Sequence, residues 1–109
     1  MSALHVSINT LLTKMDHFRN LAVKEVNAVK PNLIHAEAYT HETSDILGDL
    51  LRIVVAAERR GVVQPPDVIA RLNAAHDQVI ELALEISAFK TVMSQNTKLA
   101  PEAAKACTN

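Results

Sequence analysis

VIARLNAAHDQVIELALEISAFKTVM, residues 68–93, is the stretch that decides the fold of this chain. Its apolar residues recur in alternating steps of three and four, which places them along one seam of an α-helix. The seam comprises Val68, Leu72, Ala75, Val79, Leu82, Ile86, Phe89 and Met93. Pro65, Pro66 and Asp67 favour a helix start, because proline suits the first turn and a carboxylate complements the N-terminus. We therefore expect a helix over 66–96, followed by a flexible or weakly helical tail at 99–109.

The segment nearest the N-terminus carries the same spacing and predicts a helix over residues 3–30. Ser2 is a candidate N-cap, and Pro31 disfavours helical geometry at Lys30. Val26 covers the one gap in the pattern, at Glu25. The expected seam consists of Leu4, Ile8, Leu11, Met15, Phe18, Ala22 and Val29.

The middle segment predicts a helix over residues 33–60. Asn32 is a candidate cap, with Ser44 as an alternative start because the intervening turns are polar. Gly61 directly follows Arg59 and Arg60, which is typical of a helix end: glycine tolerates the left-handed cap, and cations suit the negative pole of the dipole. The expected seam consists of Ile46, Leu50, Ile53 and Ala57.

Composition agrees with an all-α fold. Hydrophobic residues make up 49% of the 109 residues, aromatic residues only 3%, and there are two glycines and four prolines. Few turn residues favour long elements, and an aromatic-poor core must be aliphatic. We expect a single helical domain over residues 1–98, built from three long amphipathic helices in an antiparallel bundle or hairpin arrangement and completed by homodimerisation.

The apolar surface is wider than a three-helix monomer needs, and this observation motivates the dimer. On a helical wheel the second helix presents roughly 200° of apolar surface, where a packed helix needs about 100–140°. The surplus is either buried within the bundle under charged side-chain stems or covered by another protein. We favour the second explanation, with self-association first. The expected interface residues are Leu11, Met15, Phe18, Ala22, Leu47, Leu51, Val55, Ile80 and Leu84. Which stripe faces a second copy and which faces a different partner stays open.

Several function classes are disfavoured by the sequence. A net charge of -1 and three aromatic residues argue against nucleic-acid binding. The first residues do not read as a secretory signal, and no apolar run approaches the about 20 residues of a membrane span. The chain has no glycine-rich phosphate loop or G-x-S-x-G motif, so we expect no enzyme activity and no cofactor. We place the protein in a reducing bacterial cytoplasm.

Five histidines raise the hypothesis of a metal-binding helical bundle, with His35, His41 and His76 as candidate ligands. Asp45 lies one helical turn after His41. Neither a Glu-x-x-His pair nor a His-Glu-x-x-His motif is present, so solvated polar residues are the favoured interpretation. Cys107 lies in the expected tail and is interpreted as a residue that crosslinks a dimer on oxidation rather than as a nucleophile.

In size, lack of catalytic motifs and helical pattern over Ala3–Lys98, the chain resembles the quorum-sensing antiactivators of the QslA and TraM type. The resemblance implies a helical protein that occupies the surface a transcriptional activator needs for dimerisation or DNA binding. No shared motif assigns functional positions. The same apolar surface suits a secretion chaperone or assembly subunit that covers a hydrophobic helix of its cargo, which is the alternative hypothesis.

Overall fold

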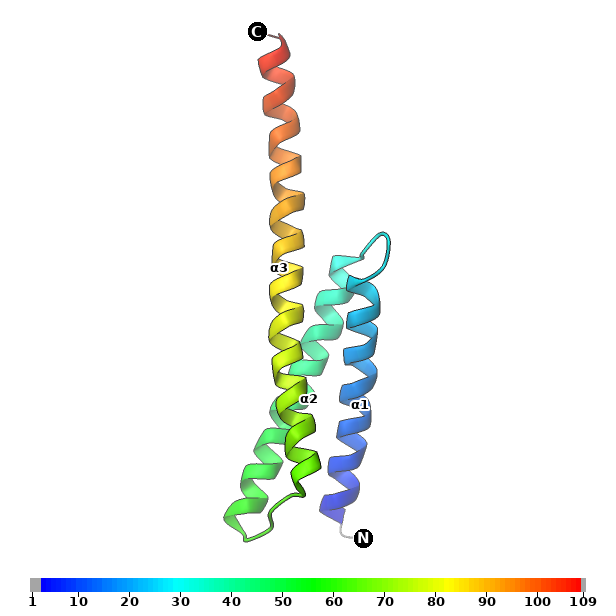
Figure 1. Ribbon diagram of the computed structural model, residues 1–109, viewed down its shortest axis with the longest axis vertical. Coiled ribbons are helices and arrows are strands. Elements are labelled where there is room, and N and C mark those ends of the chain that lie inside the picture. Colours follow the sequence, from blue (N-terminus) through cyan, green and yellow to red (C-terminus); the bar gives the residue numbers. More distant parts are fainter. Residues whose placement is uncertain (1–2, 109) are drawn as a thin grey trace.

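The computed structural model describes the backbone of residues 3–108 and the side chains of residues 3–94. It contains three helices, α1 (Ala3–Val26), α2 (Leu33–Arg59) and α3 (Pro66–Thr108). Within residues 3–108 there is no strand, so the predicted all-α class is confirmed. Figure 1 shows that successive helices run in opposite directions and that α3 continues far beyond the link between α1 and α2.

The first helix ends earlier than its pattern predicted. It stops at Val26, and Ala28 donates to the Glu25 carbonyl in a tightened last turn (3.2 Å). The Glu25 carboxylate then accepts the backbone N–H of Asn32 (2.9 Å), which draws the chain back toward α1. The helix prediction to residue 30 was therefore wrong, and Val29, predicted to lie on the seam, is fully exposed in the link.

Both ends of α2 have the predicted caps. The Asn32 side-chain oxygen accepts the backbone N–H of His35 at 3.1 Å. At the other end, Gly61 has φ +84° and donates to Glu58, while Val62 donates to the Ala57 carbonyl. This pair of bonds is the Schellman arrangement, which requires the left-handed conformation that glycine adopts without strain. Ser44 lies inside α2, so the alternative helix start there was wrong.

The third helix begins at Pro66 as predicted but extends further than expected. The sequence predicted an end near residue 96 and a flexible or weakly helical segment at 99–109, whereas the backbone remains helical through Thr108. Pro101 lacks a backbone N–H and removes one helical hydrogen bond. The alanines that surround it in the sequence have the highest helix propensity of any residue, which favours continuation past the proline.

The core is aliphatic and runs between all three helices. Its larger part joins Ile8, Leu12, Met15, Ile46, Leu47, Leu50, Val54, Val68, Leu72 and Ala75. A smaller cluster near the α1–α2 link joins Ala22, Val26, Ala36, Leu82 and Ile86. Asp16 on α1 ties the helices together at the surface, because it pairs with Arg71 on α3 (2.6 Å) and with Arg19 (3.2 Å).

The buried face of α1 is rotated from the predicted seam. Leu12 is fully buried, whereas Leu11, the predicted seam residue, is only partly buried. Helix α1 contacts α3 as well as α2, so its buried face turns toward the groove between them. A single seam describes a helix with one neighbour, and α1 has two.

Helix α3 is long enough to leave the bundle. Its 43 residues span about 65 Å at 1.5 Å per residue, within a molecule whose longest dimension is 72 Å. An ion pair joins Glu37, near the start of α2, to Lys90 of α3. We call residues 91–108 the α3 extension; Figure 1 shows it in orange and red beyond the α1–α2 link.

Candidate interaction surfaces

The predicted interface residues divide into a buried and an exposed group. Met15, Ala22 and Leu47 are buried in the core, and Leu11 and Phe18 are partly buried against it. Phe18 also lies against Tyr39 of α2, with ring centroids 6.4 Å apart. In this conformation these five residues hold the three helices together.

The remaining four predicted residues are exposed. Leu51 and Val55 lie on α2, and Ile80 and Leu84 lie on α3. Leu84 is 66% exposed, more than any other leucine whose side chain is described as exposed. Part of the surplus apolar arc is therefore used inside the chain and part remains at its surface. We call these four residues the α2/α3 surface.

A second apolar surface lies where α3 leaves the bundle. Phe89, Val92 and Met93 are 40%, 53% and 56% exposed. By their spacing, Phe89 and Met93 continue the same seam that buries Ile86 one turn before Phe89 and Leu82 two turns before it. We call Phe89, Val92 and Met93 the extension surface. This seam does not stop where the covering helices stop.

An apolar cleft adjoins the extension surface at the end of α1. It has a volume of about 420 Å³ and is lined by Val26, Asn27, Glu85, Ala88, Phe89 and Val92. Phe89 thus lies partly within the cleft and partly at the surface beyond it. The cleft extends the apolar area of the extension surface back to the last residue of α1.

A further cleft runs between α2 and α3. It has a volume of about 320 Å³ and its floor includes Thr40, Val79, Ala83 and Ile86. Glu37 and Lys90 stand together at one end of it. The Lys90 ammonium donates to the Glu37 carboxylate and lowers the pKa of that carboxyl, because both the hydrogen bond and the positive charge favour its ionised form.

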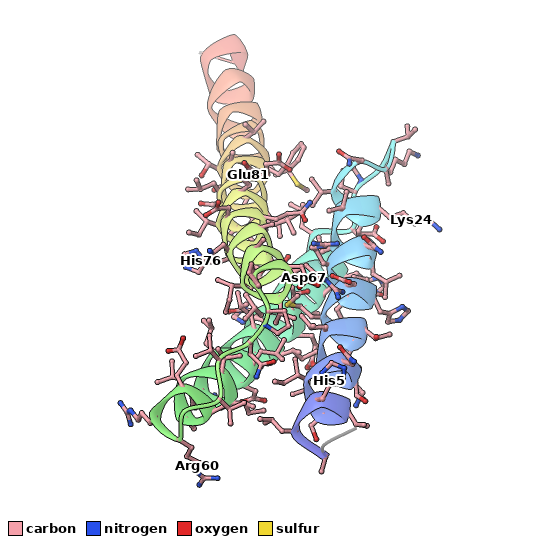
Figure 2. All side chains as sticks on the ribbon, turned by 60° about the horizontal axis from the view of Figure 1, so that its bottom comes forward. His5, Lys24, Arg60, Asp67, His76 and Glu81 are labelled. Atoms are coloured by element: carbon pink, nitrogen blue, oxygen red, sulfur yellow. The ribbon has the colours of Figure 1, made fainter. Side chains whose placement is uncertain are left out.

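The candidate metal ligands are not brought together. Among the residues whose side chains are described, no group of three histidine, cysteine or acidic side chains is placed to hold a metal ion. Figure 2 shows His76 on the side of α3 turned away from α1. His35 instead lies beside Tyr39 on α2, with ring centroids 6.3 Å apart. Cys107 lies outside the residues whose side chains are described.

Sequence reasoning placed Phe89 and Met93 on a seam but did not identify the extension surface. The signal that could have identified this surface is the length of the apolar seam compared with the length of the helices that cover it. By residue count, the 27 residues of α2 reach along α3 to about residue 92, so the predicted seam, which runs to Met93, reaches the limit of what α2 can cover. A heptad pattern gives the direction of an apolar face but not the extent of its partners.

Within the described residues, none of the three helices combines the length and apolarity that crossing a membrane requires. Neither a family model, nor a curated protein, nor a solved structure matches the chain.

Proposed function

We propose that this chain is a non-enzymatic regulatory interaction module: a helical homodimer that binds and sequesters a second protein such as a transcriptional activator. The observation that carries the proposal is the uncovered run of the α3 seam past the end of α1 and α2. A seam of core spacing predicts a partner, and α1 and α2 bury this seam as far as Ile86 but leave Phe89 and Met93 40% and 56% exposed.

The energetics of helix packing support a partner for the extension. Most helical stability in proteins comes from packing an apolar face rather than from helix propensity. Within the described part of the α3 extension, Val92 shares a cleft with Val26 and Asn27 at the end of α1 and is still 53% exposed. Covering the exposed parts of Phe89 and Val92 would contribute about 1–2 kcal/mol each.

The α2/α3 surface supplies a site for a different partner. Its exposed residues Leu51 and Val55 lie on α2, and its residues Ile80 and Leu84 lie on α3 before the residues of the extension surface. Two separate apolar surfaces suit a protein that pairs with itself through one and occupies a regulator through the other. Sequestration then works by covering the surface that an activator uses to dimerise or to bind DNA, without direct contact to nucleic acid and within the bacterial cytoplasm.

Native mass spectrometry of tagged protein, isolated gently from its source cells, tests this function. The expected species contains two copies of the 11.9 kDa chain and a second polypeptide. That polypeptide, once identified, is assayed for DNA binding with increasing amounts of this chain, and loss of DNA binding is expected. A chain recovered only as a monomer, with no companion, would contradict the proposal.

Substitutions on the α2/α3 surface separate partner binding from self-association. A double change Ile80→Glu and Leu84→Glu is expected to abolish capture of the companion while the dimer remains. Asn73→Glu is the matched control, because Asn73 is an exposed polar residue of the same helix. If the double variant retains both the dimer and the companion, the α2/α3 surface is not the partner site.

The α2/α3 cleft favours a second candidate, a secretion chaperone or assembly subunit. An apolar floor between two helices suits the apolar face of a third helix. This function predicts that the companion binds as an isolated helical peptide rather than as a folded regulator. Competition by a synthetic helix from the companion, measured by fluorescence anisotropy, distinguishes the two.

A further inference from the structure

The cleft between α2 and α3 has the size and lining of a small-molecule site. Its volume of about 320 Å³ lies within the range of about 300–1,000 Å³ that is usual for ligand pockets. We propose that this cleft binds a small monocarboxylate with an extended aliphatic chain, whose carboxylate lies at Lys90. None of the residues that line the cleft belongs to the extension surface or to the α2/α3 surface, so the proposal does not depend on the proposed function.

Small side chains leave the space between the two helices open. Ala83 and Ser87 lie one turn apart on α3, and Ser44 lines the cleft from α2. Ile86, which is 4% exposed, closes the floor. The hydroxyl of Thr40 already donates to the Ala36 carbonyl within α2 (2.7 Å), so it is not available to a ligand. The middle of the cleft therefore offers apolar contact rather than hydrogen bonds.

The shape of the cleft favours an extended chain. Its lining on α3 runs from Val79 to Lys90, which are about 16 Å apart at 1.5 Å per residue. A volume of about 320 Å³ equals that of about ten molecules of liquid water, and hence of a ligand with about ten non-hydrogen atoms. Spread over that length, the volume is long and narrow, which suits a linear aliphatic body better than a ring system.

The polar groups at the rim of the cleft are mainly hydrogen-bond donors. The Lys90 ammonium has three N–H groups, and the Glu37 carboxylate accepts from it. Neither the Ser44 nor the Ser87 hydroxyl has a side-chain hydrogen bond to the residues whose side chains are described. A carboxylate only accepts hydrogen bonds and has two oxygens to do so, which makes it complementary to this set of donors.

The charges at the Lys90 end favour an anion. Glu37 is the only acidic residue in the described lining of the cleft. The hydrogen bond from Lys90 and the charge of Lys90 lower the pKa of the Glu37 carboxyl, and the charge of His41, one turn further along α2, acts in the same direction. Because α2 and α3 run in opposite directions (Figure 1), these groups gather at one end and leave the apolar floor to the chain of the ligand.

Titration of the full-length chain with octanoate, followed by two-dimensional NMR of the backbone amides, tests the site. Octanoate has one carboxylate and ten non-hydrogen atoms, which matches the volume estimate of about ten. Saturable shifts are expected at Thr40, Ser44, Ala83 and Ser87. Octan-1-ol and octylamine are the matched control ligands, because they carry the same chain without the negative charge. Each is expected to bind at least about tenfold more weakly, since it lacks a charge-assisted hydrogen bond from Lys90.

Two substitutions with opposite expected effects test the role of charge. Lys90→Gln should weaken octanoate binding about tenfold and leave octan-1-ol binding unchanged, because only the carboxylate uses the ammonium group. Glu37→Gln should tighten octanoate binding, because it removes the carboxylate that competes for Lys90. Lys14→Gln, at an exposed lysine of α1, is the matched control and should change neither affinity.

A third substitution tests the position of the site. Ala83→Leu should fill the cleft and abolish the binding of octanoate and of octan-1-ol. Ala74→Leu is the matched control, because Ala74 is another exposed alanine of α3 and does not line the cleft. Circular dichroism establishes that each variant has the helix content of the parent before it is titrated.

Three results would overturn the proposal. Octan-1-ol that binds as tightly as octanoate, or octanoate affinity unchanged in both Lys90→Gln and Glu37→Gln, would show that the cleft does not recognise an anion. Octanoate that binds Ala83→Leu as it binds the parent would place the site elsewhere. Shifts that do not saturate and are as large around Phe89 as around Ala83 would show adsorption to exposed apolar side chains in general.

Discussion

Replacing Phe89 by alanine is expected to weaken the dimer far more than it weakens the fold. Phe89 is 40% exposed in the single chain. A phenylalanine buries about 150–250 Å², so about 80 Å² of it remains to be covered by a second copy. At about 25 cal/mol per Å² this amounts to about 2 kcal/mol per chain. Two-fold symmetry doubles the effect to about 4 kcal/mol, which raises the dissociation constant about 10³-fold.

Phe18→Ala is the matched control because the same side chain is removed from the interior. Phe18 packs against the main core and Tyr39, so its loss is expected to lower the free energy of unfolding by about 2–4 kcal/mol. The dissociation constant should stay within about threefold of the parent, since distant sites are usually independent.

Sedimentation velocity over a dilution series gives the dissociation constant, and urea unfolding gives the stability. Protein concentration must be fixed in the unfolding series, because dimerisation itself stabilises the folded chain. The reasoning fails if Phe89→Ala dimerises as tightly as the parent. It fails equally if Phe18→Ala, while still helical, weakens the dimer as much as Phe89→Ala does.

Three further predictions follow from individual contacts. Leu50→Ala should lower the free energy of unfolding by about 3 kcal/mol in urea, because Leu50 is fully buried in the main core; a loss below about 1 kcal/mol would contradict that packing. Gly61→Ala should cost about 1–2 kcal/mol in thermal unfolding, because φ at this position is +84°; an unchanged melting temperature would argue against the left-handed cap. Lys90→Met should raise the pKa of Glu37 toward its usual 4.5, measured by NMR titration of the carboxyl group, and an unchanged titration would refute the ion pair. Because the pair lowers the folded-state pKa of Glu37, the stabilisation is present above pH 4.5 and is lost as the pH falls through that folded-state pKa.

Local sequence signals predicted where helices begin and end when a specific residue sets the boundary. Asn32, Gly61 and Pro66 act through their own hydrogen bonds or backbone angles, and all three were predicted correctly. The predicted end of α1 was wrong because a tertiary contact determines where this helix ends. The Glu25 carboxylate binds the backbone of Asn32, seven residues away, and no periodic pattern contains that bond.

The candidate surfaces could be predicted only in part, because the spacing of apolar residues does not show how many other helices pack against a given helix. Helix α2 packs against both α1 and α3, so part of its wide apolar face is buried between the helices. Leu47 is buried and Leu51 is exposed, although the two residues are one helical turn apart. Separating them requires the positions of both neighbouring helices, which only the structure provides.

Sedimentation equilibrium of the purified chain tests most directly whether the extension surface is a self-association surface. The parent is expected to sediment at twice 11.9 kDa at micromolar concentration. Val92→Lys should sediment as a monomer of unchanged helicity, whereas Thr91→Lys, one residue away and exposed off the seam, should remain a dimer. A monomeric parent, or a Val92→Lys variant as dimeric as the parent, would contradict the account.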